Sequence, residues 1–228
     1  MEFQRFEPTI FQFLEELNDN NNRPWFQEHK PRYESDVLEP SLAFIRAFAS
    51  RLKKISPFFT AEDRRVAGSL MRVYRDTRFA KDKTPYKTNV GIQFRHEMGR
   101  DVHAPGFYVH VSPGECFLGI GAWRPDSESL RMIRQAIVER PDRWRRATRS
   151  KRFRECFELS GDSLKRPPRD FPADHPLVED LKRKDFVGLC DLEESDVLDA
   201  RFIDNVAATF AGGRPMMRFL CEALHVPF

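Results

Sequence analysis

The stretch Gly106-Phe-Tyr-Val-His-Val-Ser-Pro-Gly-Glu-Cys-Phe-Leu-Gly-Ile-Gly-Ala-Trp123 indicates the fold more clearly than any other part of this sequence. Apolar side chains alternate with polar ones from residue 107 to residue 112, which is typical of a strand with one buried face. Ser112-Pro-Gly114 is a turn signal, and Cys116 to Trp123 is a second extended run. Two strands joined by so short a connection predict a β-hairpin.

Further extended runs lie on both sides of this hairpin. Residues 66–75 and 89–96 alternate in the same way before it, and residues 186–190 form a short apolar run after it that we expect to be an edge strand. Several strands in succession favour an antiparallel sheet over a parallel one built from βαβ units. The sequence therefore predicts an antiparallel sheet of about four to six strands.

Helical spacing dominates the two ends of the chain. Residues 8–54 have apolar side chains at helical intervals, interrupted at 18–22, where Asn22 is positioned to cap a second helix. Further helices are expected within 126–158, 177–184, 200–210 and 215–224. We therefore predict one α+β domain over residues 1–228, with the N-terminal and C-terminal helices packed on the sheet.

Composition limits the classes of function. The net charge of the 228 residues is only +3, so a nucleic-acid role would need a local basic patch. The four cysteines are widely spaced, which favours free thiols in a reducing compartment. No apolar run approaches the roughly 18 residues that span a bilayer, and no signal-peptide pattern is visible. We expect a cytoplasmic protein without a membrane partner, and the sequence indicates no oligomeric state.

One segment, residues 72–89, concentrates chemically active side chains. Between Arg72 and Lys87 it contains six Lys or Arg against two Asp, with two Tyr and one Phe among them. Arginine matches phosphate or carboxylate oxygens with a planar fork, lysine adds point charges, and tyrosine offers a stacking face. The alternative is an ordinary solvated loop with internal ion pairs. The predicted ligand-binding residues are Arg72, Tyr74, Arg75, Arg78, Lys83, Tyr86 and Lys87.

This segment also carries a family resemblance. The run from Arg72 to Asn89 resembles the signature stretch of an uncharacterised, mainly bacterial family catalogued as a domain of unknown function. Residues 21–26, 106–111 and 119–125 are similar to the same family, and the resemblance extends over residues 8–225. It implies one continuous domain and marks positions between 72 and 87, but it implies no activity, cofactor or residue role.

Other candidates outside this segment have weaker support. His110 shares a strand face with Tyr108 and is a candidate acid or base if that face also carries Arg72 and Tyr74. A polar cluster, His96, Glu97, Asp101 and His103, has no recognised metal-ligand spacing. Phosphate-loop, dinucleotide, serine-hydrolase and zinc-protease motifs are all absent. The sequence therefore predicts neither a metal nor a cofactor.

Three functions remain as hypotheses. The first is binding of a phosphorylated or otherwise anionic small molecule, or of nucleic acid, through the 72–89 loop. The second is a protein-interaction or scaffold domain, in which the basic loop is a docking edge and Asp76 and Asp82 pair internally. The third is a hydrolase or phosphotransferase acting on a phosphorylated substrate, with His110 as proton shuttle.

Overall fold

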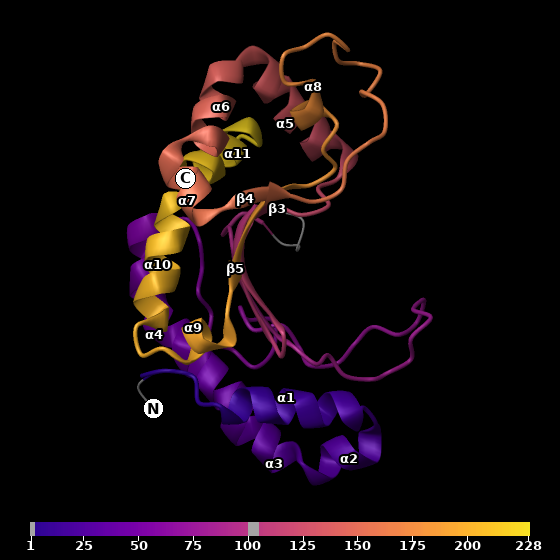
Figure 1. The fold of residues 1–228 in the computed structure, drawn as a ribbon, viewed down its shortest axis with the longest axis vertical. Helices are drawn as coiled ribbons and strands as arrows, with labels where there is room; N and C mark the ends of the chain where they lie inside the picture. The colour runs from indigo at the N-terminus through magenta and orange to yellow at the C-terminus, as the bar shows by residue number, and fades with distance from the viewer. Residues whose placement is uncertain (1–2, 100–104) are drawn as a thin grey trace.

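The predicted hairpin forms two adjoining strands of an antiparallel sheet in the computed structural model, which describes residues 3–99 and 105–228. Over those residues the sheet has five strands in the order β1-β2-β3-β5-β4 (Figure 1). The strands are β1 (Val90–Arg95), β2 (Gly106–Ser112), β3 (Glu115–Ala122), β4 (Glu158–Ser160) and β5 (Phe186–Leu192). The α+β fold class is confirmed.

The register of the hairpin places its alternate side chains on opposite faces of the sheet. Val109 pairs with Ile92 on β1 and with Leu118 on β3, and all three side chains are buried on one face. The turn between β2 and β3 is tight because Gly114 adopts a φ of 71°, a conformation that side chains disfavour. The alternation read from the sequence therefore corresponds to one packed face and one more open face.

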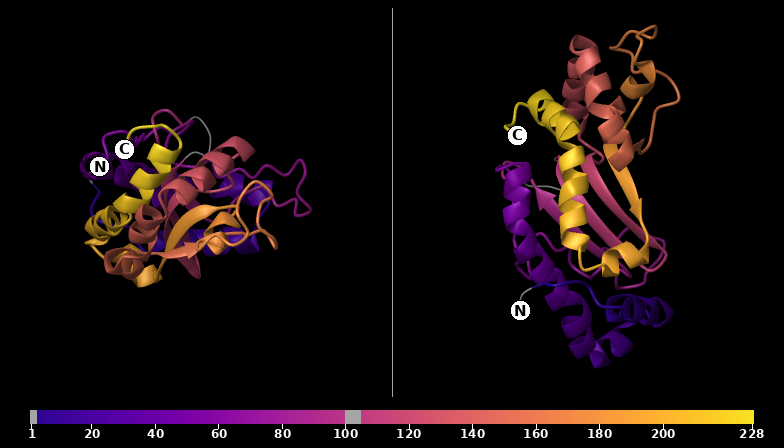
Figure 2. Two further views of the ribbon diagram at one scale, coloured as in Figure 1. Left: turned by 90° about the horizontal axis from the view of Figure 1, so that it is seen from above. Right: turned by 60° about the vertical axis from the view of Figure 1, so that its left-hand side comes forward.

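Two helices cover the packed face. They are α4 (Glu39–Ile55) and α10 (Phe202–Gly212), which lie against the sheet in Figure 1 and across the strands in the right-hand view of Figure 2. Phenylalanine rings fill the contact: Phe48 on α4 lies 4.9 Å from Phe94, and Phe210 on α10 lies 5.0 Å from Phe107, between ring centroids. The predicted packing of helices from both ends of the chain on the sheet is confirmed.

A group of short N-terminal helices lies beside one end of the sheet (Figure 1). Asn22 caps the second of them as predicted, since its side chain accepts a hydrogen bond of 3.0 Å from the Trp25 amide. The chain then stays helical up to α4 through a π-helical turn, which the sequence pattern did not predict. These elements are α1 (Thr9–Asp19), α2 (Arg23–Glu28), α3 (Lys30–Tyr33) and η1 (Glu34–Leu38).

The opposite end of the sheet carries most of the remaining helices. Asp126 caps the first of them by accepting a hydrogen bond of 2.8 Å from the Ser129 amide. The segment predicted to be helical over 126–158 is divided into three helices, because the chain breaks near Arg140 and Ser150. These helices are α5 (Ser127–Glu139), α6 (Pro141–Arg149), α7 (Lys151–Cys156), α8 (Val178–Leu181) and α11 (Arg214–Ala223). The short helix α9 (Glu194–Leu198) lies near the other end of the sheet, beside α4 and α10 (Figure 1).

Two predictions about the strands were wrong. The strand near 186–190 is not at an edge: β5 pairs with β3 on one side and with β4 on the other. β4 was not predicted, because a strand of only three residues has no recognisable alternation. The run at 66–75 is not a continuous strand, because Ala67 has a φ of 58° and the rest of the run pairs only at isolated bridges, Leu70 with Ile92 and Tyr74 with Tyr86.

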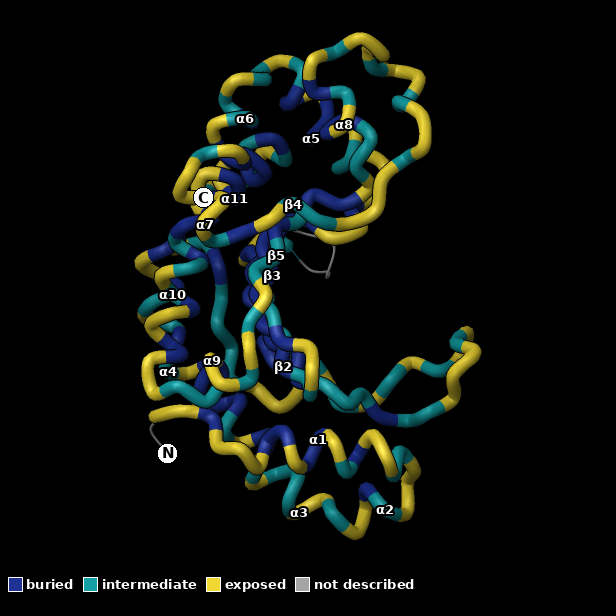
Figure 3. The backbone as a smooth tube through the Cα atoms, in the orientation of Figure 1, coloured by how far each residue is buried: buried dark blue, intermediate teal, exposed yellow. Residues whose placement is uncertain are grey.

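The second face of the sheet is more open than the first. Among the described residues, no helix lies over the middle of this face in Figure 1, and Figure 3 shows intermediate and exposed stretches along β3 and β5. Tyr108 and His110 on β2 point to this side and are only half-buried. The four cysteines are free thiols, as expected. In the part of the chain that the structure describes, no helix is long and apolar enough to cross a membrane.

Candidate functional site

Residues 72–88 form a projecting arm at the β1 edge of the sheet. The two sides of the arm are joined by backbone hydrogen bonds, from the Arg75 amide to the Pro85 carbonyl at 2.9 Å and from the Lys87 amide to the Val73 carbonyl at 2.7 Å. The arm extends outward from the sheet above α1 and α2 in Figure 1, and it projects to one side in the view from above in Figure 2. Along most of its length it is exposed or half-buried (Figure 3).

The root of the arm is anchored to the N-terminal helices. Tyr86 is only 2% exposed, and its ring stacks on Phe26 of α2 with 4.0 Å between centroids. The Asn21 side chain binds both backbone groups of Tyr86: its Oδ1 accepts from the Tyr86 amide and its Nδ2 donates to the Tyr86 carbonyl, each at 3.0 Å. Burial raises the pKa of the Tyr86 hydroxyl. Tyr86 is therefore a structural anchor rather than a free stacking surface.

Arg78 and Asp76 pair with each other near the tip of the arm. The guanidinium of Arg78 donates to both carboxylate oxygens of Asp76, at 3.0 Å and 2.7 Å. These hydrogen bonds, with one from the Arg78 amide, lower the pKa of Asp76 to about 2. Arg78 is exposed, but its charge is already matched within the arm.

Arg75 and Lys83 are also engaged inside the arm. Arg75 donates to the Asp82 carboxylate and to the Thr84 hydroxyl. The pKa of Asp82 is lowered, first by the Thr84 amide and then by Arg75. The Lys83 ammonium group donates to the Thr77 carbonyl at 2.8 Å. Three of the predicted anion-binding cations therefore have partners in the arm itself.

Lys87 differs from these three cations. It is half-buried, and among the described residues no carboxylate forms an ion pair with its ammonium group. Burial lowers its pKa, and the nearby positive charge of Arg72 lowers it further. Arg72 is exposed, and within the same described residues it has no ion-pair partner either.

Lys87 lines a cleft of about 490 Å³ between the arm and the α1–α2 turn. Its walls are mainly amide, hydroxyl and charged side chains, so a ligand there would meet hydrogen-bonding groups on several sides. The lining residues are Asn18, Asn21, Arg75, Asp76, Asp82, Thr84, Tyr86, Lys87, Thr88 and Asn89.

A second hollow of about 330 Å³ lies across the arm root from this cleft and shares Arg75 and Tyr86 with it. Tyr74 lines it and is 50% exposed, so its ring is accessible for stacking. Arg23 of α2 lines it as well, and no ion pair or hydrogen bond engages the Arg23 side chain among the described residues.

His110 lies apart from the arm, on the open face of the sheet. Its Nδ1 is 3.0 Å from the Tyr108 hydroxyl, and its ring stacks on Phe117 with 4.6 Å between centroids. Burial lowers the pKa of His110 and raises that of Tyr108 to about 12. His110 shares its strand face with Tyr108 as predicted, but neither cleft at the arm root is lined by His110.

The polar cluster between β1 and β2 does not form a metal centre in the described part of the chain. His96 is buried, its Nε2 lies 2.8 Å from the Pro227 carbonyl, and its Nδ1 accepts a hydrogen bond of 3.1 Å from the Met98 amide. Both ring nitrogens are therefore engaged in structural contacts. Asp101 and His103, the other members of the predicted cluster with Glu97, lie outside the described residues.

Sequence reasoning thus located part of the site and missed part of it. Of the predicted residues, the larger cleft brings together Arg75, Tyr86 and Lys87, whereas Arg78 and Lys83 are held in the arm beyond it. Asn18 and Asn21 were missed as site residues because the asparagine-rich turn was interpreted only as a helix boundary. The similarity of residues 21–26 to the same family as the arm could have indicated Asn21, whereas no signal in the sequence pointed to Asn18.

Comparison with known proteins agrees with that resemblance. Residues 9–219 match the model of a family of conserved hypothetical proteins, DUF2461. No curated protein and no solved structure is significantly similar to the chain. The match includes the sheet, the arm and all the residues that line the two clefts, so the chain belongs to the DUF2461 family of conserved hypothetical proteins.

Proposed function

We propose that the protein binds a small anionic ligand, with a phosphate or similar group, in the cleft at the root of the arm. The observation that carries this proposal is the state of Lys87, a half-buried cation without an acidic partner among the described residues, on the wall of a cleft of about 490 Å³. Partial burial of an unpaired charge is unfavourable, and an anion bound beside the ammonium group would compensate for it.

The two carboxylates that line the cleft, Asp76 and Asp82, are already paired with Arg78 and Arg75, and the remaining lining offers hydrogen-bonding groups to a ligand next to its charge. Asn18 and Asn89 offer amides and Thr88 offers a hydroxyl, all of which can bind phosphate or sugar oxygens. Arg75 is held by Asp82, so it would contribute through a remaining N–H group rather than through free charge. The ion pairs of the arm leave few free cations in a row, which favours a small ligand over a nucleic-acid strand.

A thermal-shift screen at low salt tests this function. Inorganic phosphate, phosphorylated small molecules, nucleotides and short oligonucleotides are compared on the native chain. A ligand present at about 100 times its dissociation constant adds about 2.7 kcal/mol of stability. For a chain of this length, that stabilisation raises Tm by roughly 5–11 °C.

Lys87→Met is the decisive variant, because it keeps the length and apolar stem of the side chain and removes the charge. We expect it to abolish the shift, whereas Lys81→Met, an exposed lysine of the same arm, should preserve the shift. An equal loss of the thermal shift in Lys87→Met and Lys81→Met would indicate non-specific attraction of the ligand to the basic arm. A shift produced only by oligonucleotides would replace the small-ligand proposal with nucleic-acid binding.

A protein-docking role for the arm is the second candidate, and one observation favours it. Phe79, near the tip, is 95% exposed, and the acidic residues beside it are paired within the arm, as the interaction hypothesis requires. Aromatic side chains are enriched at protein interfaces, so this exposed ring is available to contact a partner. A photo-crosslinking residue at position 79 identifies a partner, and the purified pair is then titrated. This candidate predicts weaker binding by Phe79→Ser and unchanged binding by Lys87→Met, and the opposite result would exclude it.

A further inference from the structure

A buried arginine in the helices at the far end of the sheet has no matching negative charge. Arg134 lies on the inward face of α5 and is only 9% exposed. Its Nη2 donates one hydrogen bond of 2.9 Å to the Arg183 carbonyl, while its Nε is buried without a hydrogen-bond partner. Across the described residues, no carboxylate forms an ion pair with Arg134.

This arrangement is costly for the chain on its own. A guanidinium group stays protonated in proteins, so Arg134 cannot avoid the cost by losing its charge. Burying a charge is unfavourable unless an opposite charge and hydrogen bonds compensate for it. Burial alone accounts for the lowered pKa of Arg134. The side chain therefore has the properties of a group that is completed by an anion.

The neighbouring side chains add to the excess of positive charge. Asp180 on α8 is buried and accepts a hydrogen bond of 2.7 Å from Arg149. The Nε of Arg183 lies 3.8 Å from the same carboxylate, too far for a hydrogen bond, and is also buried without a partner. Arg149 and Arg183 therefore share the Asp180 carboxylate, whereas Arg134 has no ion-pair partner among the described residues.

The next carboxylate along the chain does not supply the missing charge. Asp185 is buried, and its two oxygens accept hydrogen bonds from the Arg124 amide at 2.7 Å and the Asp162 amide at 2.9 Å. It serves to join the end of β3 to the segment after β4. Among the described residues, the Nε groups of Arg134 and Arg183 are left without acceptors, while Nη1 of Arg183 donates a hydrogen bond of 3.2 Å to the Ser160 carbonyl.

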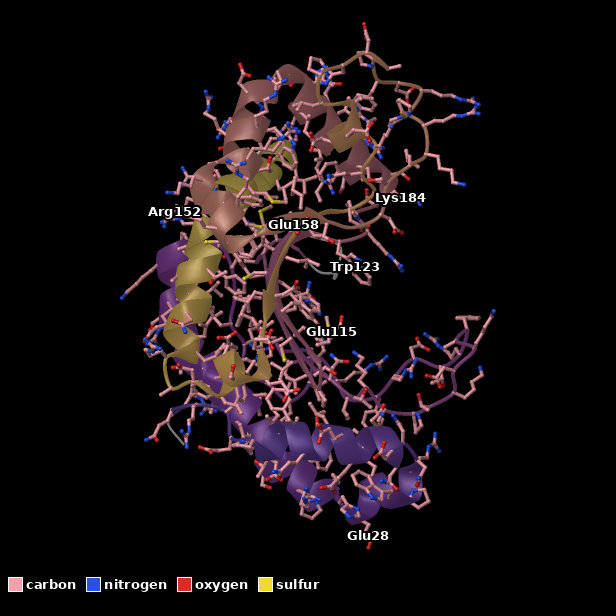
Figure 4. The ribbon with its side chains drawn as sticks, viewed as in Figure 1. Glu28, Glu115, Trp123, Arg152, Glu158 and Lys184 are labelled. Carbon is pink, nitrogen blue, oxygen red and sulfur yellow. The ribbon has the colours of Figure 1, made fainter. Side chains whose placement is uncertain are left out.

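The cluster is close to solvent on one side. Arg149 has half of its side chain exposed, and Arg183 has about one fifth exposed. The exposed residue Lys184 comes next in the chain and lies on the same side of the upper helices as Trp123 in Figure 4. Exposed cations at such a position attract anions toward the buried ones.

We propose that Arg134 and Arg183 form a second anion site, which binds a phosphate or carboxylate group of a small ligand between α5 and α8. Planar guanidinium groups with free N–H donors match the oxygens of either group. The site is independent of the cleft at the arm, which lies at the other end of the sheet (Figure 1).

The test follows the side-chain Nε–H signals of the arginines by NMR in a chain labelled with 15N-arginine. Inorganic phosphate and, separately, citrate are titrated against chloride at matched ionic strength. We expect the Arg134 and Arg183 signals to shift saturably with at least one of the two anions. The same shifts should occur in Lys87→Met, which separates this site from the proposed ligand cleft. No saturable shift at either arginine with both anions would overturn the proposal.

Two substitutions complete the test. Arg134→Met should weaken anion binding, followed at Arg183, by roughly tenfold to a hundredfold, as expected for loss of a charge-assisted hydrogen bond. Binding at native affinity in this variant would contradict the proposal. If Arg134→Met does not fold, Arg134→Lys takes its place. Lysine keeps the charge but lacks the planar fork, so this variant should also weaken anion binding. Native affinity in that variant would contradict the proposal equally.

Discussion

Replacing Asn21 with alanine should loosen the arm from the N-terminal helices. The Asn21 side chain binds the amide and the carbonyl of Tyr86 at 3.0 Å each, and the Tyr86 side chain is buried against Phe26. In Asn21→Ala both backbone groups of Tyr86 lose their partner. Since Tyr86 is the residue at which the arm enters the core, the free energy of unfolding and the shape of the cleft should both respond.

The expected loss of folding stability in Asn21→Ala follows from the two hydrogen bonds that the variant removes. Each contributes about 0.5–1.5 kcal/mol to stability, so we expect Asn21→Ala to destabilise the fold by about 1–3 kcal/mol. For a chain of this length, a loss of 2 kcal/mol lowers Tm by roughly 4–8 °C. Urea denaturation gives the free energy directly. Hydrogen exchange at the Tyr86 amide should accelerate by a larger factor than exchange at amides of β2.

Asn18→Ala is the matched control. Asn18 lines the same cleft from the last turn of α1, but its side chain makes no hydrogen bond among the described residues. Alanine has the higher helix propensity, so this variant should be as stable as the native chain or slightly more stable. If Asn21→Ala also changes stability by less than about 0.3 kcal/mol, the anchoring role assigned to Asn21 is wrong.

Other substitutions test the sheet and the core. A Cβ at Gly121 would lie 2.0 Å from the Phe186 carbonyl oxygen at a φ of 113°, so Gly121→Ala should lose at least about 2 kcal/mol by urea denaturation. Gly119→Ala, where the nearest contact is 3.5 Å, should change stability by no more than about 0.5 kcal/mol, and equal losses would contradict this reasoning. Phe26→Ala should cost about 3–5 kcal/mol, because the ring is buried under the arm, and a loss below 1 kcal/mol would show that the stack is dispensable. Burial lowers the pKa of His110 below its unfolded value of 6.5, so the unfolded chain binds more protons and stability falls as pH drops below that value. His110→Gln should remove part of this loss of stability between pH 7.5 and pH 5. An unchanged pH dependence of stability would contradict the role given to His110.

Local sequence patterns predicted the elements whose structure depends on near neighbours. The hairpin of β2 and β3 needs only alternating side chains and the Pro113-Gly114 turn, and the Asn22 cap needs only its own helix. The placement of β5 was not predictable in this way, because it depends on pairing with β3, about seventy residues earlier, and with the three-residue β4. The single-domain prediction over residues 1–228 stays a prediction.

The candidate site, too, has local features that the sequence predicts and features that depend on distant contacts. Counting charges between Arg72 and Lys87 identified the arm, but charge alone does not show which cations are paired. Arg75 meets Asp82 only because the arm folds back on itself. Lys87 is half-buried only because the arm root docks against the α1–α2 turn. Burial and pairing arise from tertiary contacts, so the residue on which the proposed function depends could not be singled out from the sequence.

The most direct test of the proposed function is an NMR titration of the lysine side chains. In a chain labelled with [13Cε]lysine, the Lys87 signal is followed against increasing inorganic phosphate at constant ionic strength, with Lys81 on the same arm as internal reference. We expect a saturable shift at Lys87 and little change at Lys81, because only Lys87 lines the cleft. Shifts of the same size and shape at both lysines, or none at Lys87, would contradict the account.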